Sequence, residues 1–189
     1  MPNILLVGNG AREHALAEAI VRSARQPRLF SFMKANNPGI AALSKKIRQG
    51  GYADLAAITG FAREQQIDFA VIGPEDPLNH GVVDALAQIG IPSVGPNQSL
   101  ARLETSKAFT RRLLSKYDIP GNPQYRVFST LAGVKEFLDT LEAVVLKPDG
   151  LTGGKGVLVQ GDHFASKDEA LALCAQILKD SASVIVEEK

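Results

Sequence analysis

The chain has 189 residues, 45% of them hydrophobic, which suffices for one large domain or for one domain and part of another. A formal net charge of +1 and a 6% aromatic share without tryptophan argue against a dedicated nucleic-acid binder, because that class needs a basic surface and stacking side chains. No apolar run approaches the roughly 18 residues of a membrane span, and the start shows no secretory signal. The single cysteine, Cys174, cannot form an internal disulfide, so we expect a cytoplasmic protein.

The first predicted unit is a strand, a glycine turn and a helix. Residues 3 to 7 form a continuous apolar run typical of a buried strand, and Gly8-Asn9-Gly10 leads into a helix over residues 12 to 23. The free N–H groups of a helix start favour a phosphate, which Arg12 would help to bind. Glu13 and His14 have an alternative interpretation as helix residues that face solvent.

A dinucleotide site is a weaker interpretation of the same turn. The third glycine of that fingerprint would fall at Glu13. The acidic residue that should follow a second strand, predicted over residues 28 to 32, is also missing. NAD binding therefore loses most of its support.

The next units repeat the alternation of helix and strand. A helix is expected over residues 53 to 66 and a strand over residues 69 to 72. The turn that follows, Gly73-Pro74-Glu75-Asp76-Pro77, should lie beside the Gly8 turn, since ligands bind beyond the carboxyl ends of parallel strands. We interpret Asp76 as the helix N-cap, with Pro77 as the first helical residue, and Glu75 as the ligand candidate. A helix over residues 82 to 88 and a further strand near residue 91 complete a doubly wound α/β domain.

A second domain begins with a helix from Ser106 to about Tyr117, capped by Thr105 or Ser106. Lys107 lies at a helix start, where a positive charge is mildly unfavourable, so it either serves a ligand or is a plain exposed residue. A strand over residues 125 to 128, helices over 131 to 139 and 167 to 179, and a strand over 183 to 186 follow. The sequence ends soon after this strand, and we expect it to be cut short.

Residues 144 to 159 combine an apolar run ending in Lys147, a glycine-rich loop with Lys155, and a second apolar run. This pattern predicts strand, loop and strand, with backbone N–H groups and two lysines around an anion. A P-loop is excluded because Lys155 is followed by Gly156 and not by Ser or Thr and a helix. A plain hairpin loop with solvated lysines remains the alternative.

Five segments carry a resemblance over essentially the whole chain. They are residues 4 to 16, residues 71 to 78 with 81 to 84, Gly95-Pro96, residues 103 to 109, and residues 144 to 159. In this order they closely resemble the phosphoribosylamine–glycine ligases, also called glycinamide ribonucleotide synthetases. Five motifs in the family's order are far more specific than any one of them.

The resemblance implies an α/β chain with a Rossmann-like substrate-binding domain over residues 1 to 100, a linker helix region over 101 to 122, and a partial ATP-grasp domain over 123 to 189. In this family ATP phosphorylates glycine, and the amine of 5-phosphoribosylamine then attacks the acyl phosphate, a step of purine biosynthesis. Magnesium neutralises charge in such phosphoryl transfer. The implied partners are these small molecules, with no nucleic acid and no membrane.

The resemblance also implies the site residues. Those for ATP are Lys107, Lys147, Asp149, Gly150, Gly153, Gly154, Lys155, Gly156, Glu187 and Glu188. Those for the substrates are Gly8, Asn9, Gly10, Arg12, Glu13, His14, Gly73, Pro74 and Glu75. No catalytic residue and no metal ligand is assigned within the chain.

Two departures from the family qualify this interpretation. Ala11 stands where the family usually has a glycine, which implies a small shift of the turn. The magnesium ligands and the carboxyl-terminal domain have no counterparts here, so we expect an amino-terminal portion that is poorly active alone, with the missing half as a candidate partner chain. The alternatives are another ATP-grasp ligase, such as a carboxylase or another amine ligase, and a nucleotide-binding remnant without catalysis.

Overall fold

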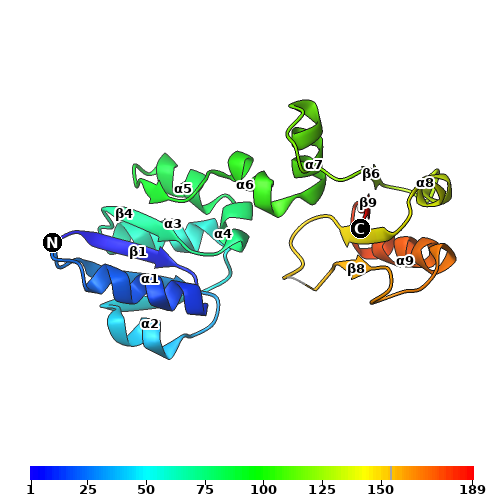
Figure 1. The fold of residues 1–189 in the computed structure, drawn as a ribbon. Helices are drawn as coiled ribbons and strands as arrows, with labels where there is room; N and C mark the ends of the chain where they lie inside the picture. Colours follow the sequence, from blue (N-terminus) through cyan, green and yellow to red (C-terminus); the bar gives the residue numbers. More distant parts are fainter. Residues whose placement is uncertain (154) are drawn as a thin grey trace. The chain divides into compact units, whose positions relative to one another are not determined.

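The computed structural model describes residues 1–153 and 155–189 (Figure 1). Contacts between residues divide the chain into two compact units, Met1–Ala101 and Arg102–Lys189, which we call the first and the second unit. Within the described ranges, no helix has both the length and the apolar character that crossing a membrane requires.

The first unit is built on a five-stranded sheet in the order β3-β2-β1-β4-β5, and every neighbouring pair is parallel. The strands are β1 (Asn3–Val7), β2 (Arg28–Met33), β3 (Lys46–Gln49), β4 (Phe69–Ile72) and β5 (Ser93–Val94). β1 is central and fully buried, as its continuous apolar run predicts for a strand covered on both faces. The predicted doubly wound α/β domain is confirmed.

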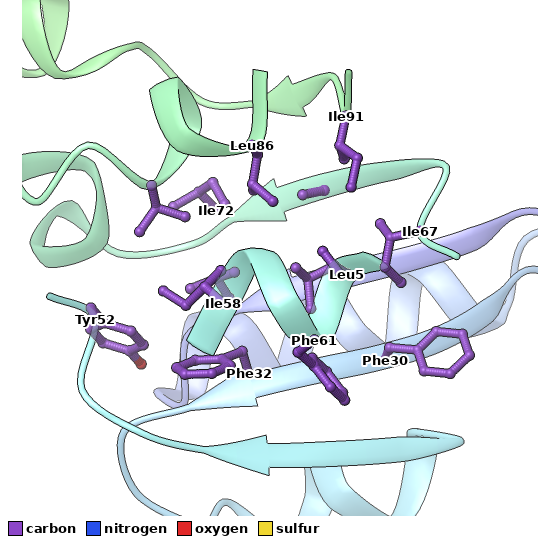
Figure 2. Close-up of a cluster of buried hydrophobic side chains, with 14 residues drawn as sticks. Leu5, Phe30, Phe32, Tyr52, Ile58, Phe61, Ile67, Ile72, Leu86 and Ile91 are labelled. Carbon is purple, nitrogen blue, oxygen red and sulfur yellow. The ribbon is translucent and has the colours of Figure 1, made fainter. Parts of the chain in front are cut away.

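Helices cover both faces of this sheet. They are α1 (Ala11–Val21), α2 (Pro38–Leu43), α3 (Leu55–Glu64), α4 (Glu75–Asn79) and α5 (Val82–Gln88), and α6 (Gln98–Thr105) follows. Leu5 and Val7 pack with α3 and α5 in the core shown in Figure 2. Leu6, between them in sequence, faces α1 and α2 instead, because successive side chains of a strand point to opposite faces.

The prediction differs from the structure at several places in this unit. β3, α2 and α6 were not anticipated; Lys46, Arg48 and Gln49 of β3 are polar, as suits a strand at the sheet edge. The assignment of Asp76 as N-cap is wrong, since α4 begins at Glu75 with Pro74 as its N-cap. Pro77 is the third helical residue, a position where its missing N–H has no intrahelical partner to lose.

The second unit contains an antiparallel sheet in the order β6-β9-β7-β8. Its strands are β6 (Tyr125–Phe128), β7 (Val144–Pro148), β8 (Leu158–Val159) and β9 (Val184–Glu188), and its helices are α7 (Lys107–Lys116), α8 (Val134–Thr140) and α9 (Lys167–Asp180). The sequence placed each of these elements to within a few residues. The two strands predicted at the ends of residues 144 to 159 are present as β7 and β8.

The two faces of this sheet differ in chemistry. Val144, Leu146, Val184 and Val186 form a core with α8 and α9. The alternate residues of β7 and β9 include Lys147 and Glu187, which therefore lie on the opposite face. The period of the strands thus separates the packed face from a charged one.

Candidate functional site

The first candidate site lies where the strands of the parallel sheet end. An open cavity of about 380 Å³ is lined by residues of the turns after β1, β3 and β4. They are Asn9, Gly10, Ala11, Arg12, Glu13, Tyr52, Pro74 and Asp76. The sequence predicted that the Gly8 and Gly73 turns share this edge, and Glu13 links them.

Glu13 occupies the space between the two glycine turns. A Cβ added at Gly8 would lie 2.4 Å from Glu13 Cγ, and one added at Gly73 would lie 2.3 Å from it. Gly8 also has a φ of +136°, which side chains rarely adopt. Both glycines are therefore required by the close approach of this one side chain.

The Glu13 carboxylate is buried, with 3% of the residue exposed, so the solvent-facing alternative is wrong for it. Its Oε2 accepts a hydrogen bond from Gly10 N at 2.6 Å, while Oε1 has no partner among the described residues. A buried polar atom without a partner is rare and costly. Oε1 is therefore an acceptor available to a donor group of a ligand at the cavity.

The other predicted substrate residues are more exposed. Arg12 Nη2 lies 3.4 Å from Glu75 Oε2, a weak contact between an exposed arginine and a half-buried carboxylate. His14 is half-buried and packs over Gly39, where an added Cβ would lie 2.2 Å from its ring. His14 therefore contributes to the packing of α1 on α2.

Three further polar residues support the turn after β1. Tyr52 Oη donates to Asn9 Oδ1 at 2.7 Å, and Asn37 Nδ2 donates to Asn9 O at 3.1 Å. Asn37 Oδ1 also accepts from Gly39 N and so caps α2. Burial raises the pKa of Tyr52, and the charges of Glu13 and Asp76 act in the same direction, so the phenol stays protonated.

Asp76 lines the same cavity. Its carboxylate lies 3.3 Å from His80 Nε2 and 3.7 Å from Lys34 Nζ. Asp76 is thus a polar wall of the site and not a helix cap.

The second candidate site is the charged face of the second sheet. The buried Glu187 carboxylate accepts from Arg111 Nε at 2.8 Å and from Lys147 Nζ. Burial lowers the pKa of Lys147, as do the charges of Arg111 and Lys107. The three cations lie close enough to influence one another, which is the arrangement that a polyphosphate needs.

The loop between β7 and β8 is tied to α7. Lys107 Nζ donates to Gly150 O at 2.7 Å. The Asp149 carboxylate accepts from Ser106 Oγ and from Ala108 N, so in this structure it holds the start of α7. Because Ser106 is also the N-cap of α7, loop and helix share one hydrogen-bond network.

The remaining predicted ATP residues have different surroundings. Gly150 and Gly153 have positive φ, at +87° and +59°. Gly156 does not, but a Cβ there would lie 2.8 Å from Pro148. Lys155 is exposed, and Glu188 Oε1 accepts from Gln124 N at 2.9 Å. Gly154 lies outside the described residues.

Across residues 1–153 and 155–189, no group of three or more His, Cys, Asp or Glu side chains is arranged to hold a metal ion. That residues outside these ranges supply the magnesium ligands stays a prediction.

Sequence reasoning missed Tyr52, Asn37 and Arg111. Tyr52 follows β3 after Gly50 and Gly51, so recognising that edge strand would have placed it at the same sheet edge as Asn9. Asn37 precedes Pro38 and Gly39, a helix-start signal that was available. Nothing in its local pattern distinguishes Arg111 from the neighbouring Arg112.

Comparison with known proteins covers the whole chain. A family model described as the phosphoribosylglycinamide synthetase N domain matches residues 2–104, and one described as its ATP-grasp (A) domain matches residues 105–189. A phosphoribosylamine–glycine ligase of Methanococcoides burtonii is 44% identical over 186 residues, which cover 98% of this chain and 43% of that protein. A Methanopyrus kandleri relative of the same name is also 44% identical, and the chain again covers 43% of it.

Solved structures agree with the fold. The phosphoribosylamine–glycine ligase of Thermotoga maritima has a TM-score of 0.73 at 25% identity, over 99% of this chain and 44% of that one. The ADP complex of an N5-carboxyaminoimidazole ribonucleotide synthetase has a TM-score of 0.76 at 18% identity, over 100% of this chain and 47% of that one. The chain thus spans less than half the length of the curated relatives it matches.

Proposed function

Since the chain belongs to the phosphoribosylglycinamide synthetase family, we propose that it supplies the substrate-binding domain and part of the nucleotide-binding domain of a phosphoribosylamine–glycine ligase. The proposed reaction joins glycine to 5-phosphoribosylamine with ATP, giving glycinamide ribonucleotide, ADP and phosphate in the cytoplasm. We keep the proposed domain bounds of residues 1 to 100, 101 to 122 and 123 to 189.

The observation that carries the proposal is the charged face of the second sheet. Lys107, Lys147 and Arg111 outnumber the carboxylates of Glu187 and Asp149, and a glycine-bearing loop adjoins them. An excess of positive charge beside exposed backbone fits a nucleotide polyphosphate. Lys107 and Lys147 would hold its phosphates, and ATP supplies the phosphoryl group that activates a carboxylate.

Lys147 and Lys107 must exchange their present partners before they can bind the phosphates. Lys147 is paired with Glu187, and Lys107 with Gly150 O, in the ligand-free structure. A phosphate oxygen is a stronger acceptor for Lys107 than a neutral carbonyl, because both partners are then charged. We propose that Glu187 keeps Arg111 as its partner while the two lysines turn to the phosphates.

The first unit supports the other half of the reaction. Its cavity combines donors, at Arg12 and the start of α1, with the unpaired acceptor Glu13 Oε1. Such a cavity suits a phosphorylated sugar that carries hydroxyl groups or an amine. We propose that Gly8 to His14 and Gly73 to Glu75 bind the substrates, and that the chain alone turns over poorly because the relatives are more than twice as long.

The test combines the chain with a second chain that supplies the remaining part of the Methanococcoides burtonii ligase. We expect ADP release from MgATP that requires both glycine and 5-phosphoribosylamine, and little release by the 189-residue chain alone. ADP release that does not change when either substrate is left out would contradict the proposed reaction. Substantial turnover by the 189-residue chain alone would contradict the proposal that this chain is poorly active by itself.

A further inference from the structure

We infer that Tyr52 is a positioning residue that fixes the polarity of the Asn9 side chain, so that Asn9 presents its amide N–H₂ group as a donor to the cavity of the first unit. The inference rests on the proposed function, because it assigns the donor to an acceptor oxygen of the phosphorylated sugar. Tyr52 and Asn9 come from the turns after β3 and β1, and both line the cavity.

The direction of the hydrogen bonds follows from what each group can donate. The backbone N–H of Lys34 points to Tyr52 Oη at a distance of 3.4 Å, so the phenol oxygen acts as acceptor there. Its own proton is then free for Asn9 Oδ1 at 2.7 Å. Asn9 therefore has its carbonyl oxygen toward Tyr52 and its nitrogen on the other side.

The surroundings hold this arrangement in place. Tyr52 is only 5% exposed and packs in the core of Figure 2, so its ring is fixed. Asn37 holds the backbone carbonyl of Asn9, which leaves the Asn9 side chain as the adjustable part of the turn. Among the hydrogen bonds of the described residues, Asn9 Nδ2 makes none.

The consequence is a cavity with two kinds of polar group. Asn9 Nδ2 and Arg12 are donors, and Glu13 Oε1 is an acceptor in the same lining. Without the Tyr52 hydroxyl, the Asn9 amide could turn its oxygen toward the cavity, and an oxygen there would oppose a phosphate or a hydroxyl lone pair. Tyr52 thus sets which ligand atom the Asn9 side chain can bind.

The first experiment examines the ligand-free chain. In ¹⁵N-labelled protein, we expect Tyr52→Phe to shift the resonances of the Asn9 side-chain amide, because this amide no longer has a single orientation. The melting temperature should stay near that of wild type. Tyr117→Phe is the matched control, since Tyr117 is 60% exposed in the second unit. Unchanged Asn9 side-chain resonances in Tyr52→Phe would overturn the inference without any ligand.

The second experiment measures the binding of ribose 5-phosphate and of MgATP by calorimetry. A lost hydrogen bond to a charged oxygen predicts roughly tenfold weaker ribose 5-phosphate binding for Tyr52→Phe, with MgATP binding unchanged. Asn9→Asp can still accept the hydrogen bond from Tyr52, but it replaces the N–H₂ donor by a negatively charged oxygen. The loss of ribose 5-phosphate affinity should therefore be larger for Asn9→Asp than for Tyr52→Phe. Ribose 5-phosphate binding to Asn9→Asp as tight as to wild type would overturn the inference.

The two experiments separate this inference from the function on which it rests. If wild type does not bind ribose 5-phosphate, the assignment of the cavity fails, while the ligand-free spectra still decide whether Tyr52 orients Asn9. If wild type binds and Tyr52→Phe binds equally well, the assignment survives and the positioning role is wrong.

Discussion

The candidate sites of the two units are built in opposite ways. In the first unit, backbone turns and glycines enclose Glu13, whose Oε1 atom has no partner among the described residues. In the second unit, Lys147, Arg111 and Lys107 all have partners before any ligand is bound. The first site therefore depends on shape, and the second depends on charge that must be exchanged.

This difference predicts different responses to substitution. A site made by close packing should fail when volume is added, and it should be insensitive to salt. A site made by paired charges should fail when one charge is removed, because the remaining charge is then buried without compensation. The four predictions below test this contrast in order of decreasing effect.

The largest effect is expected for Glu187→Gln in the second unit. Glu187 is buried between Lys147 and Arg111, so its loss leaves two cations without a carboxylate, at a cost of about 3 kcal/mol in the free energy of unfolding. Amide hydrogen exchange should show the loss in the second unit alone. Glu136→Gln, on the exposed surface of α8, is the control. Equal destabilisation by both variants would remove the contrast.

The next effect is expected for Lys147→Met, which keeps the length of the side chain and removes its charge. Loss of one charged contact predicts roughly thirtyfold weaker MgATP binding, a change of about 2 kcal/mol. Calorimetry of MgATP and of ribose 5-phosphate measures both sites. Lys135→Met is the control, because Lys135 is exposed and its ion pair is with Asp139 on the surface of the same helix. Unchanged MgATP affinity would exclude Lys147 from the nucleotide site.

A smaller effect is expected for Gly73→Ala in the first unit. The new Cβ would lie 2.3 Å from Cγ of the buried Glu13, and relieving this overlap should cost about 1–2 kcal/mol. Gly60→Ala is the opposite control, since Gly60 is in α3 with nothing within 4 Å, and alanine there should stabilise by about 0.5–1 kcal/mol. Chemical denaturation measures both, and a stabilised Gly73→Ala would show that the turn is not closely packed.

The smallest effect is an alkaline destabilisation that Cys174 should contribute in the second unit. Burial raises the pKa of the Cys174 thiol to about 11 from 9.0. The unfolded chain releases this proton at lower pH than the folded chain. The contribution of Cys174 to the free energy of unfolding is therefore complete below pH 9 and declines as pH rises toward 11, by roughly 1.3 kcal/mol between pH 8 and pH 10.

Cys174→Ala should lack this part of the decline, and denaturation curves at the two pH values measure the difference. In the native protein the thiol should also resist labelling at pH 8, since it is fully buried. Rapid labelling under native conditions would show that the second core opens readily.

The sequence predicted most of the fold because apolar runs and helical spacing are local signals. Residues 3 to 7, 69 to 72 and 125 to 128 were placed as strands, and each is a strand in the structure. β3 was missed because an edge strand with Lys46 and Arg48 carries no apolar run. The same omission hid Tyr52, whose place at the site follows only from the order of strands in the sheet.

The site was predicted as a set of residues but not as a set of contacts. The resemblance named Glu13 and Glu187, and sequence could not show that both are buried or that Glu187 pairs with Lys147 and Arg111. Asp76 was misassigned because a proline at the first and at the third helical position gives a similar pattern. Pairings between distant residues depend on packing, which no local pattern records.

The strand order of the second unit bears on the order in which the molecule folds during synthesis. β9 lies between β6 and β7, although it follows both in the chain. A ribosome must therefore reach residue 188 before β6 and β7 gain the strand that joins them, whereas β1 to β5 of the first unit are all present once residue 94 has been made. The first unit can complete its sheet while the chain still grows, and the charged face that holds Lys147 and Glu187 forms after that sheet.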